Sequence, residues 1–234
     1  MIRLATVAVL LTLVKLGLWQ LDRAAHKQQL QQQYQQRAQQ RLQWPLPTEG
    51  DLRGYQLQIS GNWLPQQALL LDNQVVDGQV GYRYLVPLQV SLEQPWLLVD
   101  LGFVAAPSRR EQLPALPPLP SRSVVLGRLL QPQPNRLADQ LLPEVGVVTR
   151  IQALNWSQLQ QHWQHPLIPA LLWLQQPQQL GFKRPWQPIN MAAEKHHAYA
   201  LQWFSLALAW LVVALLLWRR NRKGTTANPV NRPI

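Results

Sequence analysis

The sequence predicts a membrane protein of the α+β class, with two transmembrane helices flanking a β-rich extracytoplasmic domain that is either a small barrel or a sandwich. One observation behind this prediction is an apolar run near each end of the 234-residue chain. The other is a series of short alternating and β-branched segments between those runs. A chain of this length has room for one domain of ordinary size with extra elements, so we expect one core.

The first apolar run, residues 2–20, is predicted to be a transmembrane helix. It has about 18 mainly apolar residues, which is near the lower limit for spanning the hydrocarbon. Lys15 lies close to the aromatic end, where its stem can reach the interface. A secretory signal is the alternative, but the bulky and charged residues of "LGLWQLDRAAHK" offer no small-residue cleavage site. We therefore expect an uncleaved anchor.

Residues 21–44 are predicted to continue this helix out of the membrane. The segment contains good helix formers and neither Gly nor Pro, and its apolar residues are four apart at Leu30, Tyr34, Ala38 and Leu42. Its many glutamines leave a disordered low-complexity tract as the alternative.

Residues 45–197 are predicted to form the β-rich domain. From Arg53 the hydrophobic period changes to that of strands, with "GYQLQISGNWL" as the clearest alternating segment. Such runs imply an antiparallel sheet, with "IPALLWLQ" as one further strand and "NWSQLQQHW" as a short helix. We expect a core on one face of that sheet, formed by Trp63, Leu70, Tyr82, Val86, Leu98 and Val125.

The second apolar run, residues 198–218, is long enough to cross a bilayer and contains no charged residue. Aromatic residues mark its two ends, as is typical of membrane interfaces. They are Tyr199, Trp203 and Phe204 at the first end and Trp218 at the second. A basic tail, residues 219–234, follows.

The net charge of +11 does not indicate nucleic-acid binding, because the excess cations flank the apolar runs. Arg3 lies at the very start of the first run, "RRNRK" follows the second, and every Asp and Glu lies between the two. By the positive-inside rule both termini are cytoplasmic and the central domain is on the other side, with membrane lipid as a partner.

Recognisable catalytic chemistry is missing from the sequence, so we expect no enzyme. The chain has no cysteine, which excludes disulfides, thiolate metal sites, covalently attached c-type haem and cysteine nucleophiles. Neither G-x-S-x-G, H-E-x-x-H, a P-loop nor a dinucleotide fingerprint occurs. His162 and His165 have a spacing that suits a metal on a helix, but without further ligands we expect a solvent-facing pair.

Four blocks of the sequence, taken together and in order, resemble the surfeit locus family of cytochrome c oxidase assembly factors. They are the exit of the first anchor "LGLWQLDRAAHK", the block "GNWL…LLDNQ…GQVGYRYLVPL", the segment "PWLLVDLGFVAAPSRR", and "GFKRPWQPINMAAEKHHAYALQWF". The junction H-x-x-Y-A-x-Q-W-F before the second anchor is the most specific part. The chain departs from the family pattern at Leu101 and at Gln74, where the family usually has arginine.

The resemblance implies a non-enzymatic accessory factor for haem–copper cytochrome c oxidase, acting when haem a is placed in the largest subunit. The implied partners are that subunit and other assembly factors. The implied location is the bacterial cytoplasmic (inner) membrane, because no Arg- and Ser-rich transit peptide precedes the first anchor. The resemblance leaves open whether haem a itself is bound in transit. A membrane-anchored scaffold of another envelope complex, without a cofactor, is the alternative function.

His196 occupies the family's histidine position, which makes it the candidate haem-iron ligand. It lies three residues before Tyr199 and seven before Trp203, so a continuous helix places all three on one face. An imidazole nitrogen can ligate haem iron, and its other nitrogen needs a partner that orients it. The competing interpretation is that these residues are interfacial anchors.

Lys183 and Arg184 are candidates for contacts with the haem propionates. Attraction to lipid headgroups explains the same two cations equally well. In the predicted strand around Gly81, alternation puts Arg83 on the opposite face from Tyr82 and Tyr84, and we expect the two tyrosines to pack in the core.

Overall fold

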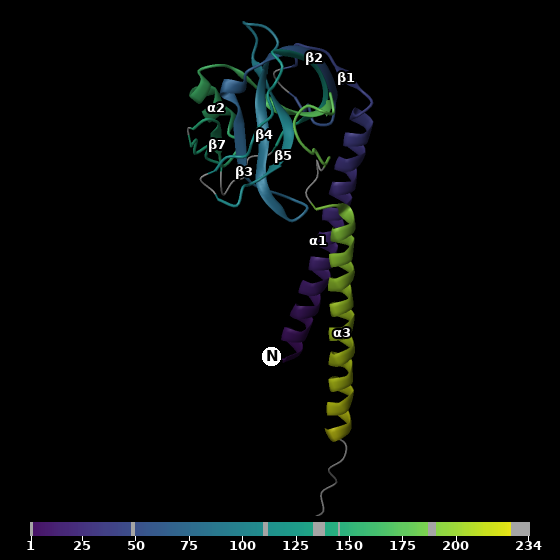
Figure 1. The fold of residues 1–234 in the computed structure, drawn as a ribbon. Coiled ribbons are helices and arrows are strands. Elements are labelled where there is room, and N and C mark those ends of the chain that lie inside the picture. Colours follow the sequence, from purple (N-terminus) through teal and green to yellow (C-terminus); the bar gives the residue numbers. More distant parts are fainter. Residues whose placement is uncertain are drawn as a thin grey trace, which may run out of the picture. The chain divides into compact units, whose positions relative to one another are not determined.

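The computed structural model describes residues 2–47, 50–109, 112–132, 139–144, 146–186 and 191–225, with only the backbone described for residues 2, 3 and 221–225. The chain divides into two compact units, which we treat separately (Figure 1). A helical unit comprises Met1–Gln32 and Ile189–Ile234, and a β unit comprises Gln33–Pro188. The end of the predicted basic tail, including Arg232, lies outside the described residues.

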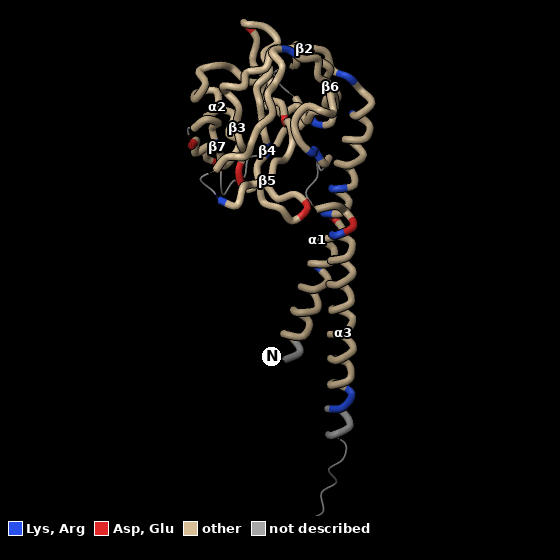
Figure 2. The backbone as a smooth tube through the Cα atoms, in the orientation of Figure 1, with Lys and Arg blue, Asp and Glu red and all other residues tan. Residues whose placement is uncertain are grey.

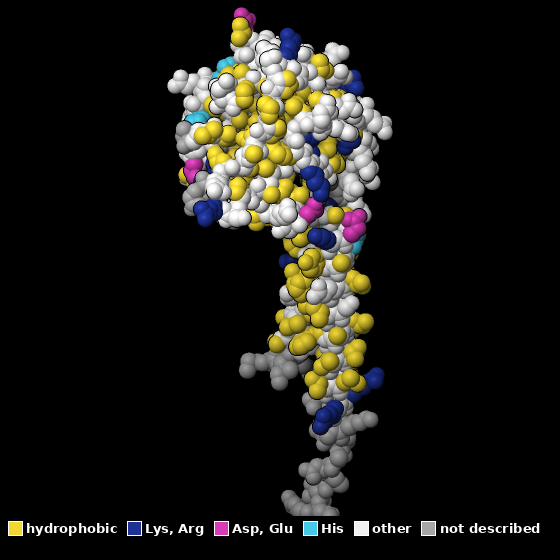
Figure 3. All heavy atoms as spheres, viewed as in Figure 1, with side chains coloured by type: hydrophobic (Ala, Val, Ile, Leu, Met, Phe, Trp, Pro, Cys, Tyr) yellow, Lys and Arg dark blue, Asp and Glu magenta, His cyan; other side chains and the backbone are white. Residues whose placement is uncertain are grey.

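Two long helices run through the helical unit. Helix α1 (Ile2–Arg37) joins the predicted anchor to most of its extension but ends seven residues before the expected residue 44, and residues 41–42 form a short strand instead. Helix α3 (Ala193–Thr225) begins five residues before the expected Ala198. Both are long and apolar enough to cross a membrane. After Glu194 and Lys195 in its first turn, α3 has no charged residue until Arg219 and Arg220, as the tan stretch of this helix in Figure 2 shows, and Figure 3 shows apolar side chains along the visible face of the helices.

The two helices pack through small residues. On α3 the buried positions include Ala200 and Ala207, which are seven residues apart and therefore on one face. On α1 the buried Gly17 has no room for a side chain, because an added Cβ would lie 2.6 Å from the ring of Phe204. Small residues allow helix backbones to approach closely, which is how membrane helices commonly associate.

The two helices are antiparallel, as two hydrogen bonds show. The indole Nε1 of Trp210 donates to the carbonyl oxygen of Thr6 at 3.1 Å. Farther along α1, the side chain of Gln20 pairs with His196 at 2.7 Å. Residue numbers therefore rise along α1 while they fall along α3.

Besides the end of α1, the described residues of the β unit form eight strands, one 3-10 turn and one short helix. The strands are β1 (Arg41–Leu42), β2 (Gln56–Trp63), β3 (Leu69–Val76), β4 (Gln79–Gln89), β5 (Trp96–Ala105), β6 (Arg122–Leu130), β7 (Thr149–Ile151) and β8 (Leu167–Gln176); the turn is Pro65–Gln67 and the helix is α2 (Trp156–Trp163). The predicted strand at "IPALLWLQ" and the predicted helix at "NWSQLQQHW" are thus confirmed. The side chain of Asn155 caps α2 by accepting from the Gln158 amide.

The strands form one sheet in the order β1-β2-β6-β8-β5-β4-β3-β7. Strand β2 also pairs with β4, through Asn62 with Gln89 and Trp63 with Leu88. The pairings from β2 through β6, β8, β5 and β4 therefore return to β2. The strands of this ring supply most of the residues of the larger of two hydrophobic clusters.

The prediction of an antiparallel sheet is wrong for one central pair and two short edge pairs. Strand β8 runs parallel to β5, β1 runs parallel to β2, and β7 runs parallel to β3. A parallel pair needs a long crossover between its strands. Here β6, β7 and α2 lie between β5 and β8 in the sequence, so the pairing is not visible in either strand alone.

All six predicted core residues are buried, but they do not share one face. Trp63, Leu70, Tyr82, Val86 and Val125 belong to the larger cluster. Leu98 belongs to a second cluster, with Leu69, Leu85 and others. Strand β5 is buried on both faces, so successive residues alternate between the two clusters. The expectation that Leu98 shares the first face is therefore wrong.

Candidate functional site

His196 lies in the first turns of α3 and is turned away from solvent. Its imidazole is 8 % exposed, and Nδ1 lies 2.7 Å from the side-chain oxygen Oε1 of Gln20 on α1. The neighbouring His197 is exposed, and its Nε2 lies 3.3 Å from the amide nitrogen of Gln28. The two adjacent histidines thus have different environments, because successive helical residues are about 100° apart.

Tyr199 and Trp203 follow His196 along the same side of α3. Tyr199 is 45 % exposed and Trp203 is half-buried. Residues three and seven positions apart on a helix form one stripe, and here the histidine is its most buried member. The stripe therefore places two partly exposed aromatic rings next to a buried imidazole.

Lys183 lies in the β unit, where its main chain pairs with that of Phe103. Its ammonium nitrogen is 2.7 Å from the carboxylate of Asp77, and both side chains are largely exposed. A surface ion pair of this kind is weak and exchanges readily with water and other anions. Lys183 is thus available to an incoming anionic group.

Arg184 uses its guanidinium within the β unit. It donates to the carbonyl oxygens of Leu180, of Gln178 at 3.0 Å and of Leu101 at 3.3 Å. Burial lowers the pKa of Arg184, and the negative charge of Asp100 opposes that effect. These hydrogen bonds stabilise the turn that follows β8. Arg184 therefore has a structural role, which the sequence did not indicate.

Lys183 and Arg184 line the same open pocket, together with Trp173, Phe182 and several glutamines. The pocket has a volume of about 540 Å³. The predicted haem-contact residues therefore form two groups. His196, Tyr199 and Trp203 belong to the helical unit, and Lys183 and Arg184 belong to the β unit.

Asp100 is a buried charged residue for which the sequence pattern predicted no role. It is 1 % exposed, and it accepts hydrogen bonds from Arg83 and from the amide of Gly102 at 2.9 Å. Arg83 leaves the sheet on the face opposite Tyr82 and Tyr84, which are both buried as predicted. A lone carboxylate in the apolar run "LLVDLGFV" was the signal that could have found this pair.

The structure accounts for the two positions at which the family usually has arginine. Leu101 is fully buried in the larger hydrophobic cluster. Gln74 is half-buried and donates from Nε2 to the carbonyl oxygen of Asp72 at 2.9 Å. Neither position presents a cation here, and Leu101 adds instead to the apolar core.

His162 and His165 are not the expected solvent-facing pair. His162 is exposed at the end of α2, but His165 lies beyond that helix and stacks on Trp96, with ring centroids 4.0 Å apart. The left-handed Gln164 ends the helix between them. Among the described residues, no group of three or more His, Cys, Asp or Glu side chains is placed to hold a metal ion.

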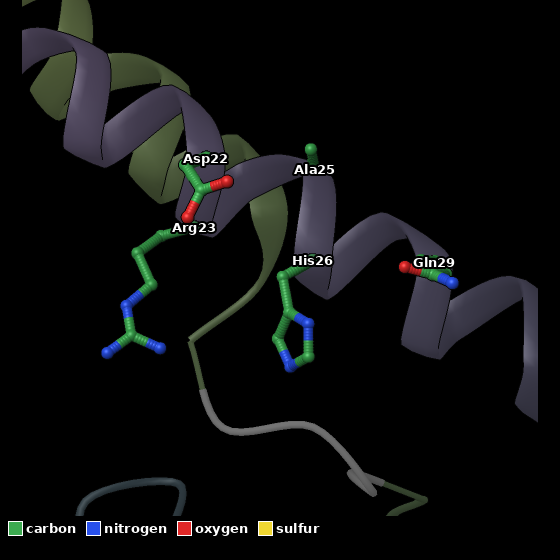
Figure 4. A pocket seen from close by; sticks show the side chains of 5 residues that line it. All are labelled: Asp22, Arg23, Ala25, His26 and Gln29. Atoms are coloured by element: carbon green, nitrogen blue, oxygen red, sulfur yellow. The ribbon is translucent and has the colours of Figure 1, made fainter.

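A polar pocket of about 330 Å³ follows the apolar part of α1 (Figure 4). Asp22, Arg23, Ala25, His26 and Gln29 line it, and Arg23 and His26 project from the same side of the helix. The guanidinium of Arg23 also lies over the ring of Trp19, at 5.6 Å from its centroid. A tryptophan paired with a cation at the end of an apolar helix is typical of a membrane interface.

Comparison with protein families gives a match that covers most of the chain. A sequence model of the SURF1 family matches residues 7–208, a range that includes most of α1, the first half of α3 and every described strand. No individual curated protein matches the chain.

Proposed function

Because the chain belongs to the SURF1 family, which is linked to cytochrome c oxidase assembly, we propose that it assists the placement of haem a in the largest oxidase subunit. In this role the protein is a membrane-anchored, non-enzymatic chaperone. Its two long apolar helices support the membrane anchor. Its partners are the oxidase subunit, other assembly factors and lipid of the bacterial cytoplasmic membrane.

The observation that carries the haem step is the environment of His196. One ring nitrogen, Nδ1, is paired with Gln20, and within the described residues the other nitrogen, Nε2, has no hydrogen-bond partner. This donor set fits a haem, whose iron accepts an imidazole nitrogen as an axial ligand. The imidazole is 8 % exposed, so contact with a macrocycle requires neighbouring side chains to shift.

The aromatic residues of the stripe would cover the macrocycle. Tyr199 and Trp203 offer large apolar rings next to His196, and such rings stack on flat ligands. In the β unit, considered by itself, Lys183 is better able than Arg184 to take up an anionic group, because its ion-pair partner Asp77 is a solvent-exposed carboxylate. The guanidinium of Arg184 already donates hydrogen bonds to three carbonyl oxygens.

The decisive experiment replaces each of the two histidines in turn. Full-length wild type, His196→Ala and His197→Ala are purified at matched levels from cells that make haem a, and haem content is read from absorbance. We expect His196→Ala to lose haem while its membrane insertion stays normal, because little apolar area is removed. His197→Ala is the control, since His197 is exposed on another side of the helix.

Two outcomes contradict the proposal at different levels. Equal haem content in wild type and His196→Ala removes the ligand assignment. Normal oxidase activity in membranes from a strain that lacks the whole protein removes the assembly role as well.

The burial of His196 favours a second function, that of a scaffold without a cofactor. In that case the hydrogen bond between Gln20 and His196 serves only to hold α1 against α3. Purified protein would then contain no haem in any variant, and His196→Ala would weaken the association of the helices instead.

A further inference from the structure

We propose that Gln20 is the positioning residue that sets the tautomer and orientation of His196. This inference rests on the proposed role of His196 as an axial ligand. It concerns α1, where the sequence analysis identified no functional residue. Gln20 lies directly after Trp19, at the end of the apolar run.

The chemistry of the hydrogen bond fixes the tautomer. The atom of Gln20 that faces His196 is the carbonyl oxygen Oε1, 2.7 Å from Nδ1. A carbonyl oxygen only accepts hydrogen bonds, so Nδ1 must carry the proton and donate it. A neutral imidazole has one N–H, which leaves Nε2 with a free lone pair. That is the form in which a histidine ligates a metal through Nε2.

The surroundings make this hydrogen bond hard to replace by water. His196 is 8 % exposed and Gln20 is half-buried. One turn earlier on α1, Gly17 lies against the ring of Phe204, which holds the two helices close together. In such surroundings a lost partner leaves a buried polar group unsatisfied, and the imidazole gains freedom to rotate or to move its proton.

The chain contains a matched control in the second pair of glutamine and histidine. Gln28 and His197 also join α1 to α3, but there the amide nitrogen faces Nε2 at 3.3 Å and both residues are exposed. Substitution of Gln28 therefore removes a similar amide without changing the tautomer of His196.

The first test uses the protein without haem. Full-length protein is labelled with ¹⁵N-histidine in detergent micelles, and the ring resonances of His196 are identified by their loss in His196→Ala. At mildly alkaline pH we expect a protonated Nδ1 and an unprotonated Nε2 in wild type and in Gln28→Leu. Gln20→Leu should shift the proton toward Nε2 or give a mixture. Gln20→Glu, whose carboxylate also accepts, should keep the wild-type pattern.

The second test measures haem a in the same variants, purified from cells that make it. Loss of a residue that orients a metal-ligating histidine typically weakens binding by about 10- to 100-fold. We expect such a loss and an altered absorption spectrum in Gln20→Leu, rescue in Gln20→Glu, and wild-type behaviour in Gln28→Leu. If Gln20→Leu does not accumulate, the comparison of Gln20→Glu with Gln20→Asn replaces it, because the shorter Asn cannot reach Nδ1.

The outcomes separate this inference from the proposed function. A wild-type His196 pattern in the ¹⁵N spectrum of Gln20→Leu, or in that of Gln20→Asn if it takes the Leu variant's place, overturns the inference. So does haem binding equal to wild type in the variant that lacks the acceptor, provided that His196→Ala loses haem. If His196→Ala keeps its haem, the ligand assignment fails, while the tautomer result still decides the role of Gln20.

Discussion

At the scale of single residues, Asp100 is a buried carboxylate whose charge needs partners inside the β unit. Its side chain is only 2 % exposed, and its charge is balanced by Arg83, whose side chain is 18 % exposed. The amide of Gly102 completes the set of donors. A buried carboxylate is tolerated only with such partners, because desolvation of an unpaired charge costs several kcal/mol.

We expect Asp100→Ala to destabilise the protein by about 3 kcal/mol, because Arg83 is left as an uncompensated and mostly buried cation. Thermal or denaturant unfolding of the full-length protein in micelles, followed by tryptophan fluorescence, measures this loss. Asp51→Ala is the control. Asp51 also pairs with arginines, but its side chain is 34 % exposed, and the expected loss is below about 1 kcal/mol.

A second substitution tests the cause of that loss. Removing the cation as well, in the double variant Asp100→Ala with Arg83→Met, should restore part of the stability. If the double variant is less stable than Asp100→Ala alone, the loss comes from packing and not from the unpaired charge.

At the scale of elements, a close contact between the two long helices lies at Gly17. An added Cβ there would lie 2.6 Å from the Phe204 ring. We expect Gly17→Leu to separate α1 from α3 and so to weaken the pairing of Gln20 with His196 on the next turn. Because the chain has no cysteine, a pair introduced by Thr6→Cys and Trp210→Cys reports helix proximity through a bifunctional crosslinker.

The matched control is Ala5→Leu, an equal change at an exposed position of α1. Crosslinking should persist in this control and fall in Gly17→Leu. Adding Phe204→Ala to Gly17→Leu should restore the crosslink, because the clashing ring is gone. Crosslinking unaffected by Gly17→Leu would contradict the packing of Gly17 on Phe204.

What the sequence could predict at this scale depends on whether the signal is local. Long apolar runs placed both long helices, and alternation placed the β-rich segments, because each of these patterns is visible in neighbouring residues. The pairing of β5 with β8 joins residues about 70 positions apart, such as Trp96 and Leu167, and no local pattern specifies it. The early start of α3 at Ala193 was missed because the turn holding His196 is polar on its outer side.

The candidate site was predictable only in part for the same reason. Helical spacing correctly placed His196, Tyr199 and Trp203 on one stripe of α3. The hydrogen-bond partner of His196 is Gln20, 176 positions away in the sequence. Gln20 ends the first apolar run, whose sequence indicates only a membrane anchor. Likewise, the carbonyl partners of Arg184 exist only once the chain has turned after β8.

At the scale of the whole molecule, charge at the ends of the apolar helices sets the orientation that the proposed function requires. Arg219 and Arg220 follow the uncharged part of α3, whereas Asp51, Asp72, Asp77 and Asp100 lie in the β unit. Short basic flanks stay in the cytoplasm, and long segments cross the membrane regardless of a modest charge. If this orientation holds, the start of α3, with the candidate ligand His196, faces the outer side of the membrane.

We therefore expect both termini in the cytoplasm and the β unit in the periplasm. Full-length and truncated chains are fused to a reporter that is active only in the periplasm and to one that is active only in the cytoplasm. Fusion at Ile234 should give cytoplasmic activity, and fusion at Gln131 should give periplasmic activity. Exchanging the basic residues after α3 for glutamine should weaken this preference, because the orientation depends on cations near the helix end. Periplasmic activity at Ile234 in the unaltered chain would overturn the topology and place the start of α3 on the wrong side for the proposed haem step.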